Sequence, residues 1–182
     1  VTGVQTCALP ISWPEFFDAA KKLKASGMEG GFTTNWISWI QLENFSAWHN
    51  LPFGTKSNGF DGLDTELVFN NPTVIKHFQT MYDLSKDKVF IYGGRTNKAN
   101  PLFTSGQVGM HFESIGGYGN MKANCKFDFG VARLPYYPDV KGAPQNSIIG
   151  GASLWVFDRK DKNELKAVAE FFAFLSKPES QA

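Results

Sequence analysis

Hydrophobic residues recur at helical spacing in three parts of the chain. The pattern predicts helices over residues 12–27, over a stretch that opens at Asn71, and over residues 163–175. At the first helix, Ser12 and Glu15 have the spacing of a capping box, in which the two residues satisfy each other's backbone N–H groups. Each helix is amphipathic, so we expect each to pack one face against a core.

Shorter apolar runs, bounded by glycine, proline or polar turn residues, predict strands. The clearest covers residues 107–113, and further strands are predicted at 66–69, 127–134 and 148–157. Glycines at 150–151 inside the last run indicate a bulge or a close approach by a ligand or another backbone segment. Strands separated by helices are typical of α/β proteins, which is the fold class that we expect.

Residues 35–50 combine aromatic and polar residues in a way that suits a binding surface. Trp36 and Trp39 are three positions apart, so on a helix both indoles would share one face. We expect residues 33–35 to cap this helix, which would place both tryptophans in its first turn beside free N–H groups. That surface would suit a small ligand that is part polyol and part anion. For an isolated pair of this kind, however, burial in the core is the better interpretation.

A second candidate ligand seat follows the strand at 107–113. Glu113 leads into the turn Ser114-Ile115-Gly116-Gly117, which opens a helix. Glycine lets a polar ligand approach free backbone N–H groups at such a turn. The spacing does not match a P-loop, and a plain helix cap is an equally good interpretation.

Composition argues against several classes of function. Lys plus Arg number 18 against 17 Asp plus Glu, without a cluster of like charge, which disfavours nucleic-acid binding. No apolar run approaches the ~20 residues of a transmembrane helix. The chain has two cysteines, Cys7 and Cys125, and His77 has no second ligand at metal-binding spacing. We therefore expect no disulfide framework, no metal site and no cofactor.

The two ends of the sequence are unusual. Residues 1–11 read like translated sequencing-adapter sequence and are excluded from the predicted fold. The sequence stops shortly after Pro178, where a helix is restarting, and we expect the segment that would carry an export signal to lie outside it. We therefore expect an internal piece of a longer protein.

Several motifs together resemble the large solute-binding proteins of ABC importers. General features of that family are Ser12-Trp13-x-Glu15-Phe16, Phe103-x-Ser105-Gly106-x-Val108-x-Met110, and Gly150-Gly151-Ala152-Ser153. A closer resemblance, to the branch that binds sn-glycerol 3-phosphate, is carried by residues 36–48, 58–62 and 143–155. The resemblance extends from about Ser12 to Ala182.

The resemblance implies a fold of the periplasmic-binding-protein type II class, in which a ligand binds in a cleft between two lobes. Residues 12–146 would form most of the second, C-terminal lobe. Residues 147–182 would form a hinge strand and one helix of the other lobe.

The resemblance also implies a ligand and the residues that bind it. Trp36 and Trp39 match the aromatic pair on the glycerol side of the cleft, Ser114 matches a serine that hydrogen-bonds the ligand, and Gly151 matches a glycine whose backbone contacts it. Tyr118 departs from the family pattern, which leaves the choice between sn-glycerol 3-phosphate and a glycerophosphodiester open. By this resemblance, the family's other ligand residues, including a tyrosine and an arginine, lie outside this chain, so the chain alone should bind weakly or not at all.

The expected function is that of the substrate-binding component of an ABC importer. It would be a monomeric, non-enzymatic, periplasmic protein that delivers its ligand to membrane permease subunits. One alternative is a sugar- or oligosaccharide-binding protein of the same fold. Another is a glycosidase-like hydrolase that uses Glu43 and Glu113 as its carboxylate pair, although nothing in the sequence fixes them at the required separation of ~5–10 Å.

Overall fold

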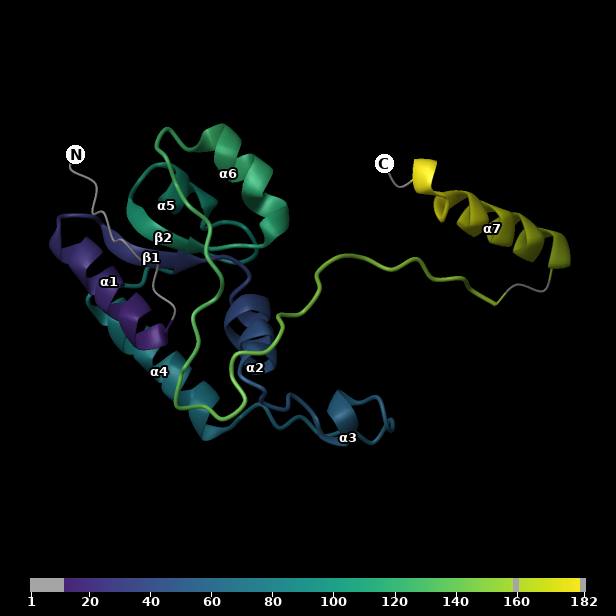
Figure 1. Ribbon diagram of the computed structural model, residues 1–182, viewed down its shortest axis with the longest axis horizontal. Helices are drawn as coiled ribbons and strands as arrows, with labels where there is room; N and C mark the ends of the chain where they lie inside the picture. The colour runs from purple at the N-terminus through teal and green to yellow at the C-terminus, as the bar shows by residue number, and fades with distance from the viewer. Residues whose placement is uncertain (1–11, 159–160, 181–182) are drawn as a thin grey trace. The chain divides into compact units, whose positions relative to one another are not determined.

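The computed structural model describes residues 12–158 and 161–180 (Figure 1). Contacts divide the chain into two units, with the boundary after Ile149. Residues 1–11, expected to derive from an adapter, lie outside the described residues. The predicted lobe boundary at residue 146 stays a prediction.

The helices of the first unit are α1 (Trp13–Ala25), α2 (Phe45–Trp48), α3 (Thr55–Asn58), α4 (Pro72–Lys86), α5 (Asn100–Thr104) and α6 (Tyr118–Asn124). A π-helix, η1 (Trp39–Asn44), leads into α2, and a 3-10 turn, η2 (Ile115–Gly117), leads into α6. The strands are β1 (Gly30–Thr34) and β2 (Val108–Phe112). The second unit contains α7 (Lys162–Leu175) and the 3-10 turn η3 (Pro178–Ser180).

A small parallel sheet organises the first unit. β1 and β2 lie side by side, with Phe32 opposite Met110 (Figure 1). On the other side of β1, Phe90 forms a parallel bridge with Phe32, and the Ile91 N–H donates to the Phe32 carbonyl at 3.0 Å. The sequence pattern does not predict this third segment, because it is short and follows α4 almost directly. All of β1 is buried, so β1 is the central element.

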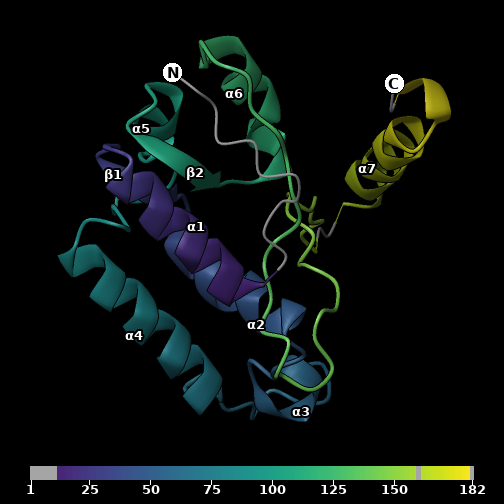
Figure 2. The same ribbon diagram turned by 60° about the vertical axis from the view of Figure 1, so that its left-hand side comes forward.

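An aromatic core joins α1 and α4 to the sheet. Figure 2 shows the ribbons of these two helices beside β1. The Trp13 ring lies in its middle, with ring centroids 4.4 Å from His77 and 5.5 Å from Phe112. α1 approaches β1 so closely that a Cβ atom added to Gly31 would lie 2.2 Å from the Ala20 carbonyl oxygen. Glycine at position 31 is therefore a condition for this packing.

The helices and the strand with the clearest sequence signals are confirmed. α1 begins with the predicted capping box: the Ser12 Oγ accepts the Glu15 N–H at 3.4 Å, and the Ser12 N–H donates to the Glu15 carboxylate at 3.0 Å. Asn71 caps α4 by accepting the Val74 N–H at 3.1 Å. α7 and β2 lie where a helix and a strand were predicted.

Three predicted strands are wrong. Residues 66–69, 127–134 and 148–157 form no strand, although Leu67 makes an isolated antiparallel bridge with Gly54. A strand exists only when a neighbour satisfies its backbone N–H and C=O groups. Within the described parts of the chain, none of these runs has such a partner strand, and the last run leaves most of its apolar side chains exposed.

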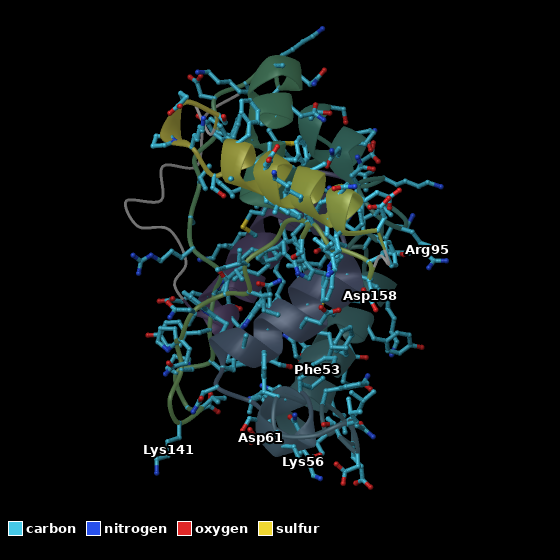
Figure 3. All side chains as sticks on the ribbon, turned by 90° about the vertical axis from the view of Figure 1, so that its right-hand side faces the viewer. Phe53, Lys56, Asp61, Arg95, Lys141 and Asp158 are labelled. Atoms are coloured by element: carbon cyan, nitrogen blue, oxygen red, sulfur yellow. The ribbon has the colours of Figure 1, made fainter. Side chains whose placement is uncertain are left out.

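The segment between α2 and α4 forms an extension around α3. Lys56 and Ser57 have left-handed backbones, with φ values of +51° and +54°. The Asn58 Oδ1 accepts the Phe53 N–H at 2.8 Å, which closes the turn. Figure 3 shows Phe53, Lys56 and Asp61 on this extension.

Candidate functional site

The tryptophan pair differs from the predicted first helical turn. Trp36 lies ahead of the π-helix with a left-handed backbone, φ +43°, and its carbonyl accepts the Ile40 N–H at 2.8 Å. Trp39 begins η1. A left-handed conformation is rare for a bulky residue and costs on the order of 1–3 kcal/mol, so the surrounding structure must hold it. The prediction that both tryptophans share a regular first turn is wrong.

The residues predicted to cap this helix have other roles. Thr33 and Thr34 belong to β1 and are fully buried. The Thr33 Oγ1 donates to the Ile91 carbonyl at 2.7 Å, and the Thr34 Oγ1 donates to the Asn35 carbonyl at 2.9 Å. The capping prediction is wrong because strand pairing uses this backbone, and a helix can begin only after Asn35.

The parallel register brings Trp36 and Ser114 to the same edge of the sheet. Thr34 lies opposite Phe112 at the ends of the strands, and the Asn35 N–H donates to the Phe112 carbonyl at 3.0 Å. Trp36 and Ser114 each follow two residues beyond that last pair. Both therefore leave from the carboxyl edge of the sheet, where ligands bind in open α/β sheets.

The two indoles differ in exposure. Trp36 is 42% exposed. Trp39 is half-buried and packs against the core, and the Asn44 Nδ2 donates to its carbonyl at 2.9 Å. The first unit thus encloses neither indole completely, and Trp36 is the more accessible of the pair.

Ser114 is a helix cap, as one interpretation of the sequence held. Its Oγ accepts the Gly116 N–H at 3.3 Å at the start of η2. The side chain is half-buried, and its hydroxyl proton is not used by this bond. The capping role therefore leaves one donor available to a ligand.

A cluster of polar side chains underlies this edge. The fully buried Asn35 donates from Nδ2 to the Asn100 Oδ1 and to the Glu113 Oε2, and its Oδ1 accepts the Ala99 N–H at 3.0 Å. The His111 Nε2 lies 3.2 Å from the Asn100 Oδ1 and 3.8 Å from the Glu113 Oε2. Sequence reasoning missed this cluster because only the pairing of β1 with β2 brings its members together.

The surroundings of Glu113 stabilise its ionised form. Burial alone would raise the pKa of Glu113, but the neighbouring His111 and hydrogen bonds from the Ser114 N–H at 2.7 Å and from Asn35 together lower that pKa below its usual range. A glycosidase general acid needs a raised pKa. The lowered pKa therefore does not suit Glu113 to the role of general acid in a hydrolase.

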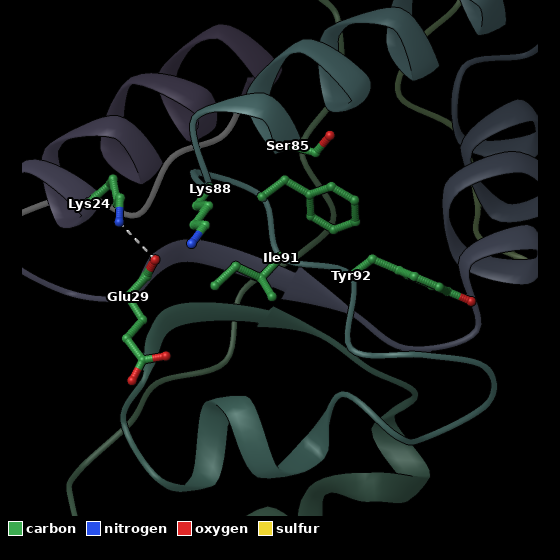
Figure 4. A pocket seen from close by; sticks show the side chains of 7 residues that line it. Lys24, Glu29, Ser85, Lys88, Ile91 and Tyr92 are labelled. Atoms are coloured by element: carbon green, nitrogen blue, oxygen red, sulfur yellow. Dashed lines mark hydrogen bonds between the residues drawn. The ribbon is translucent and has the colours of Figure 1, made fainter.

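A separate hollow of about 590 Å³ lies against the third segment of the sheet. Its lining residues are Lys24, Glu29, Ser85, Lys88, Phe90, Ile91 and Tyr92 (Figure 4). The Lys24 Nζ donates to the Glu29 carbonyl at 3.0 Å across its rim. None of the predicted ligand residues lines this hollow.

Gly151 belongs to the second unit. Its φ of +139° is rarely adopted by residues with side chains, whereas a Cβ atom there would meet nothing within 4 Å. Backbone conformation rather than crowding thus favours glycine at this position. Its contact with a ligand stays a prediction.

Two further properties bear on the class of protein. Among the described residues, no group of three or more His, Cys, Asp and Glu side chains could hold a metal ion. In the same part of the chain, no helix has the length and apolar character needed to cross a membrane.

The α/β fold and the open carboxyl edge agree with the class that the sequence comparison defines. Residues 6–182 match the bacterial extracellular solute-binding protein family, and the chain belongs to that family. This confirms the resemblance found in the motifs. The match begins within residues 1–11, whose adapter origin stays a prediction.

Several curated relatives within that class carry the same name. The chain is 52% identical over 174 residues to the sn-glycerol-3-phosphate-binding periplasmic protein UgpB of Rhizobium meliloti, covering 95% of this chain and 40% of the relative. The proteins of the same name from Pectobacterium atrosepticum (49% identity, 95% and 39% covered) and Agrobacterium fabrum (48% identity, 99% and 41% covered) are similarly close. The chain thus spans about 40% of the length of these curated relatives.

Proposed function

We propose that this chain is part of the substrate-binding component of an ABC importer. The whole protein would bind sn-glycerol 3-phosphate in a cleft between two lobes and deliver it to membrane permease subunits. The observation that carries the proposal is the common exit of Trp36 and Ser114 from the carboxyl edge of β1 and β2. The relatives named for binding sn-glycerol 3-phosphate support this choice of ligand.

The groups at this edge suit the polyol end of such a ligand. The exposed indole of Trp36 offers a flat apolar face for the C–H groups of glycerol. The hydroxyl of Ser114 offers a hydrogen-bond donor to a glycerol oxygen. The phosphate would bind elsewhere, because Glu113 gives this edge a negative charge. A cationic group outside this chain, such as the expected arginine, would hold it.

We assign residues 12–146 to most of the C-terminal lobe and residues 147–182 to the crossing into the other lobe. The amphipathic helix α7 supports the second assignment. Phe171 and Phe174 are each 54% exposed on it, and none of its residues is buried. An apolar helix face of this kind requires cover, which the remaining part of a longer protein would supply.

We further infer that the whole protein works in the periplasm as a monomer and is not an enzyme. Its relatives are named as periplasmic binding proteins, which supports both the compartment and the absence of catalysis. Their common name also favours sn-glycerol 3-phosphate over a sugar. A glycerophosphodiester differs from this ligand by one ester group, so a competition experiment must separate the two.

The test uses a chimaera in which residues 12–182 replace the matched segment of the Rhizobium meliloti relative. We expect calorimetry to show saturable binding of sn-glycerol 3-phosphate. Trp36→Ala should weaken this binding by about tenfold, because it removes the indole face that the bound ligand would cover. Tyr82→Ala is the matched control, because Tyr82 is an exposed aromatic residue on α4, outside the proposed site. Its affinity should equal that of the unsubstituted chimaera.

Two outcomes would contradict the proposal. Absence of binding by the unsubstituted chimaera would refute the function, and equal affinities of the Trp36→Ala and Tyr82→Ala variants would refute the site. If a glycerophosphodiester displaces bound sn-glycerol 3-phosphate when present at a lower concentration than sn-glycerol 3-phosphate itself, the assigned ligand changes to the glycerophosphodiester.

A further inference from the structure

We propose that Asn35 and Glu113 are positioning residues for the ligand-binding edge. Their side-chain hydrogen bond joins the two strand ends that carry Trp36 and Ser114. The inference rests on the proposed function, because it concerns the same edge. Neither residue needs to touch the ligand.

Each member of the pair immediately precedes a proposed ligand residue. Asn35 comes directly before Trp36, and Glu113 comes directly before Ser114. The backbones of the two strands are joined for the last time where the Asn35 N–H donates to the Phe112 carbonyl at 3.0 Å. The side-chain bond between Asn35 and Glu113 extends this join to the point where the chains diverge.

On the β1 side, this hydrogen bond holds Asn35 in place, and Asn35 precedes Trp36, whose backbone is strained. The left-handed backbone of Trp36 requires external support. Its N–H donates to the Thr96 carbonyl at 2.9 Å. The Asn35 side chain bonds to Ala99, Asn100 and Glu113, so it anchors the start of Trp36 to two other segments. Loss of this anchor would let the indole change its position.

On the β2 side, the Glu113 carboxylate lies beneath the turn that carries Ser114. Its Oε1 accepts the Ser114 N–H at 2.7 Å. A Cβ atom added to Gly117 would lie 2.6 Å from the Glu113 Cγ, so the turn packs directly on this side chain. One carboxylate therefore contacts both the strand end of β1 and the turn of Ser114.

The burial of Asn35 and Glu113 suits them to holding Trp36 and Ser114 in position rather than to contacting the ligand directly. Asn35 is completely buried, and the Glu113 side chain is 12% exposed. A buried carboxylate is stable only while hydrogen-bond donors surround it. The Asn35 amide is one such donor, and the Ser114 N–H is another.

A reciprocal swap tests the bond. Glu113→Gln leaves a single side-chain oxygen for two donors, the Asn35 amide and the Ser114 N–H, whereas Asn35→Asp opposes two carboxylates. The double variant restores one donor and one acceptor with reversed polarity. In that variant the Asn100 amide can turn to donate to the carboxylate introduced at position 35, since His111 has an alternative tautomer.

The measurement is the affinity of the same chimaera for sn-glycerol 3-phosphate, at a temperature where every variant is folded by circular dichroism. Each single variant should weaken binding by about tenfold, and the double variant should recover most of that loss. Asn71→Ala is the control: it removes the cap of α4 and lowers the melting temperature, but it should leave the affinity unchanged. Gly117→Ala, which displaces the carboxylate without changing charge, should weaken binding severalfold even if the swap variants fold poorly.

The inference is overturned if the single variants and Gly117→Ala bind as tightly as the unsubstituted chimaera, whatever their melting temperatures. It is also overturned if the double variant binds no better than either single variant. Loss of affinity in Trp36→Ala alone would leave the proposed function standing without this inference. A chimaera that does not bind sn-glycerol 3-phosphate at all would refute both the proposed function and this inference.

Discussion

Acid should destabilise the first unit through His77, a completely buried histidine on α4. Its ring stacks on Phe45, with centroids 4.1 Å apart and planes at 19°. Its Nε2 lies 3.0 Å from the Gln41 Oε1, which can only accept, so the neutral ring donates from Nε2. Burial, followed by the nearby His49, lowers the pKa of His77 from 6.5 to about 3.

The sign and size of the effect follow from this difference in pKa. Between pH 6.5 and 3, the unfolded chain binds a proton at His77 that the folded chain does not bind. The stability contributed by a neutral His77 is therefore complete above pH 6.5 and decreases as the pH falls, by about 1.4 kcal/mol per pH unit. From pH 7 to pH 5 the free energy of unfolding should decrease by about 2 kcal/mol on account of this residue.

The assay compares urea unfolding of the chain and of its His77→Gln variant at pH 7, 6 and 5, followed by tryptophan fluorescence. Glutamine can still donate to Gln41 but does not titrate. The variant is less stable at pH 7, because it leaves part of the aromatic pocket empty. Its free energy of unfolding should nevertheless decrease by about 2 kcal/mol less on acidification to pH 5.

The comparison cancels the other titrating groups, because His49 and Glu113 are present in both proteins. The pKa of Glu113 is also lowered on folding, so its contribution is complete above the unfolded pKa and is lost only at more acidic pH. An equal decrease in both proteins between pH 7 and pH 5 would refute the assignment of acid sensitivity to His77.

Two further predictions concern the packing of α1. Ser12→Ala removes the capping box and should lower the free energy of unfolding by about 1 kcal/mol in urea, whereas an unchanged midpoint would show that the cap is dispensable. Gly31→Ala places a Cβ atom 2.2 Å from the Ala20 carbonyl oxygen and should cost about 2–3 kcal/mol by the same measurement. A loss below about 0.5 kcal/mol there would mean that α1 can move away from β1 at little cost.

Local chemistry accounts for the parts of the fold that the sequence predicts well. The caps of α1 and α4 are made by residues three positions apart, Ser12 with Glu15 and Asn71 with Val74. Such signals need no distant partner, so they can be recognised in the sequence. The motifs that resemble the solute-binding family were also sufficient to identify that family, and the family match confirms the identification.

The strands were harder to predict because a strand depends on what lies beside it. The apolar run at 148–157 has the composition of a strand but pairs with no strand among the described residues. Phe90, by contrast, pairs with Phe32 although the short segment around it gives a weak signal. Pairing between distant segments cannot be read from either run alone.

The candidate site likewise has features that the sequence predicts and features that depend on the tertiary structure. The residue types of Trp36 and Ser114, and their resemblance to ligand residues of the family, were visible in the chain. The left-handed backbone of Trp36, its exposure, and the bond between Asn35 and Glu113 depend on the register of β1 with β2. Asn35 and Glu113 are 78 positions apart, and no periodicity links them. Only the folded sheet brings them into contact, because parallel strands place their carboxyl ends at one edge.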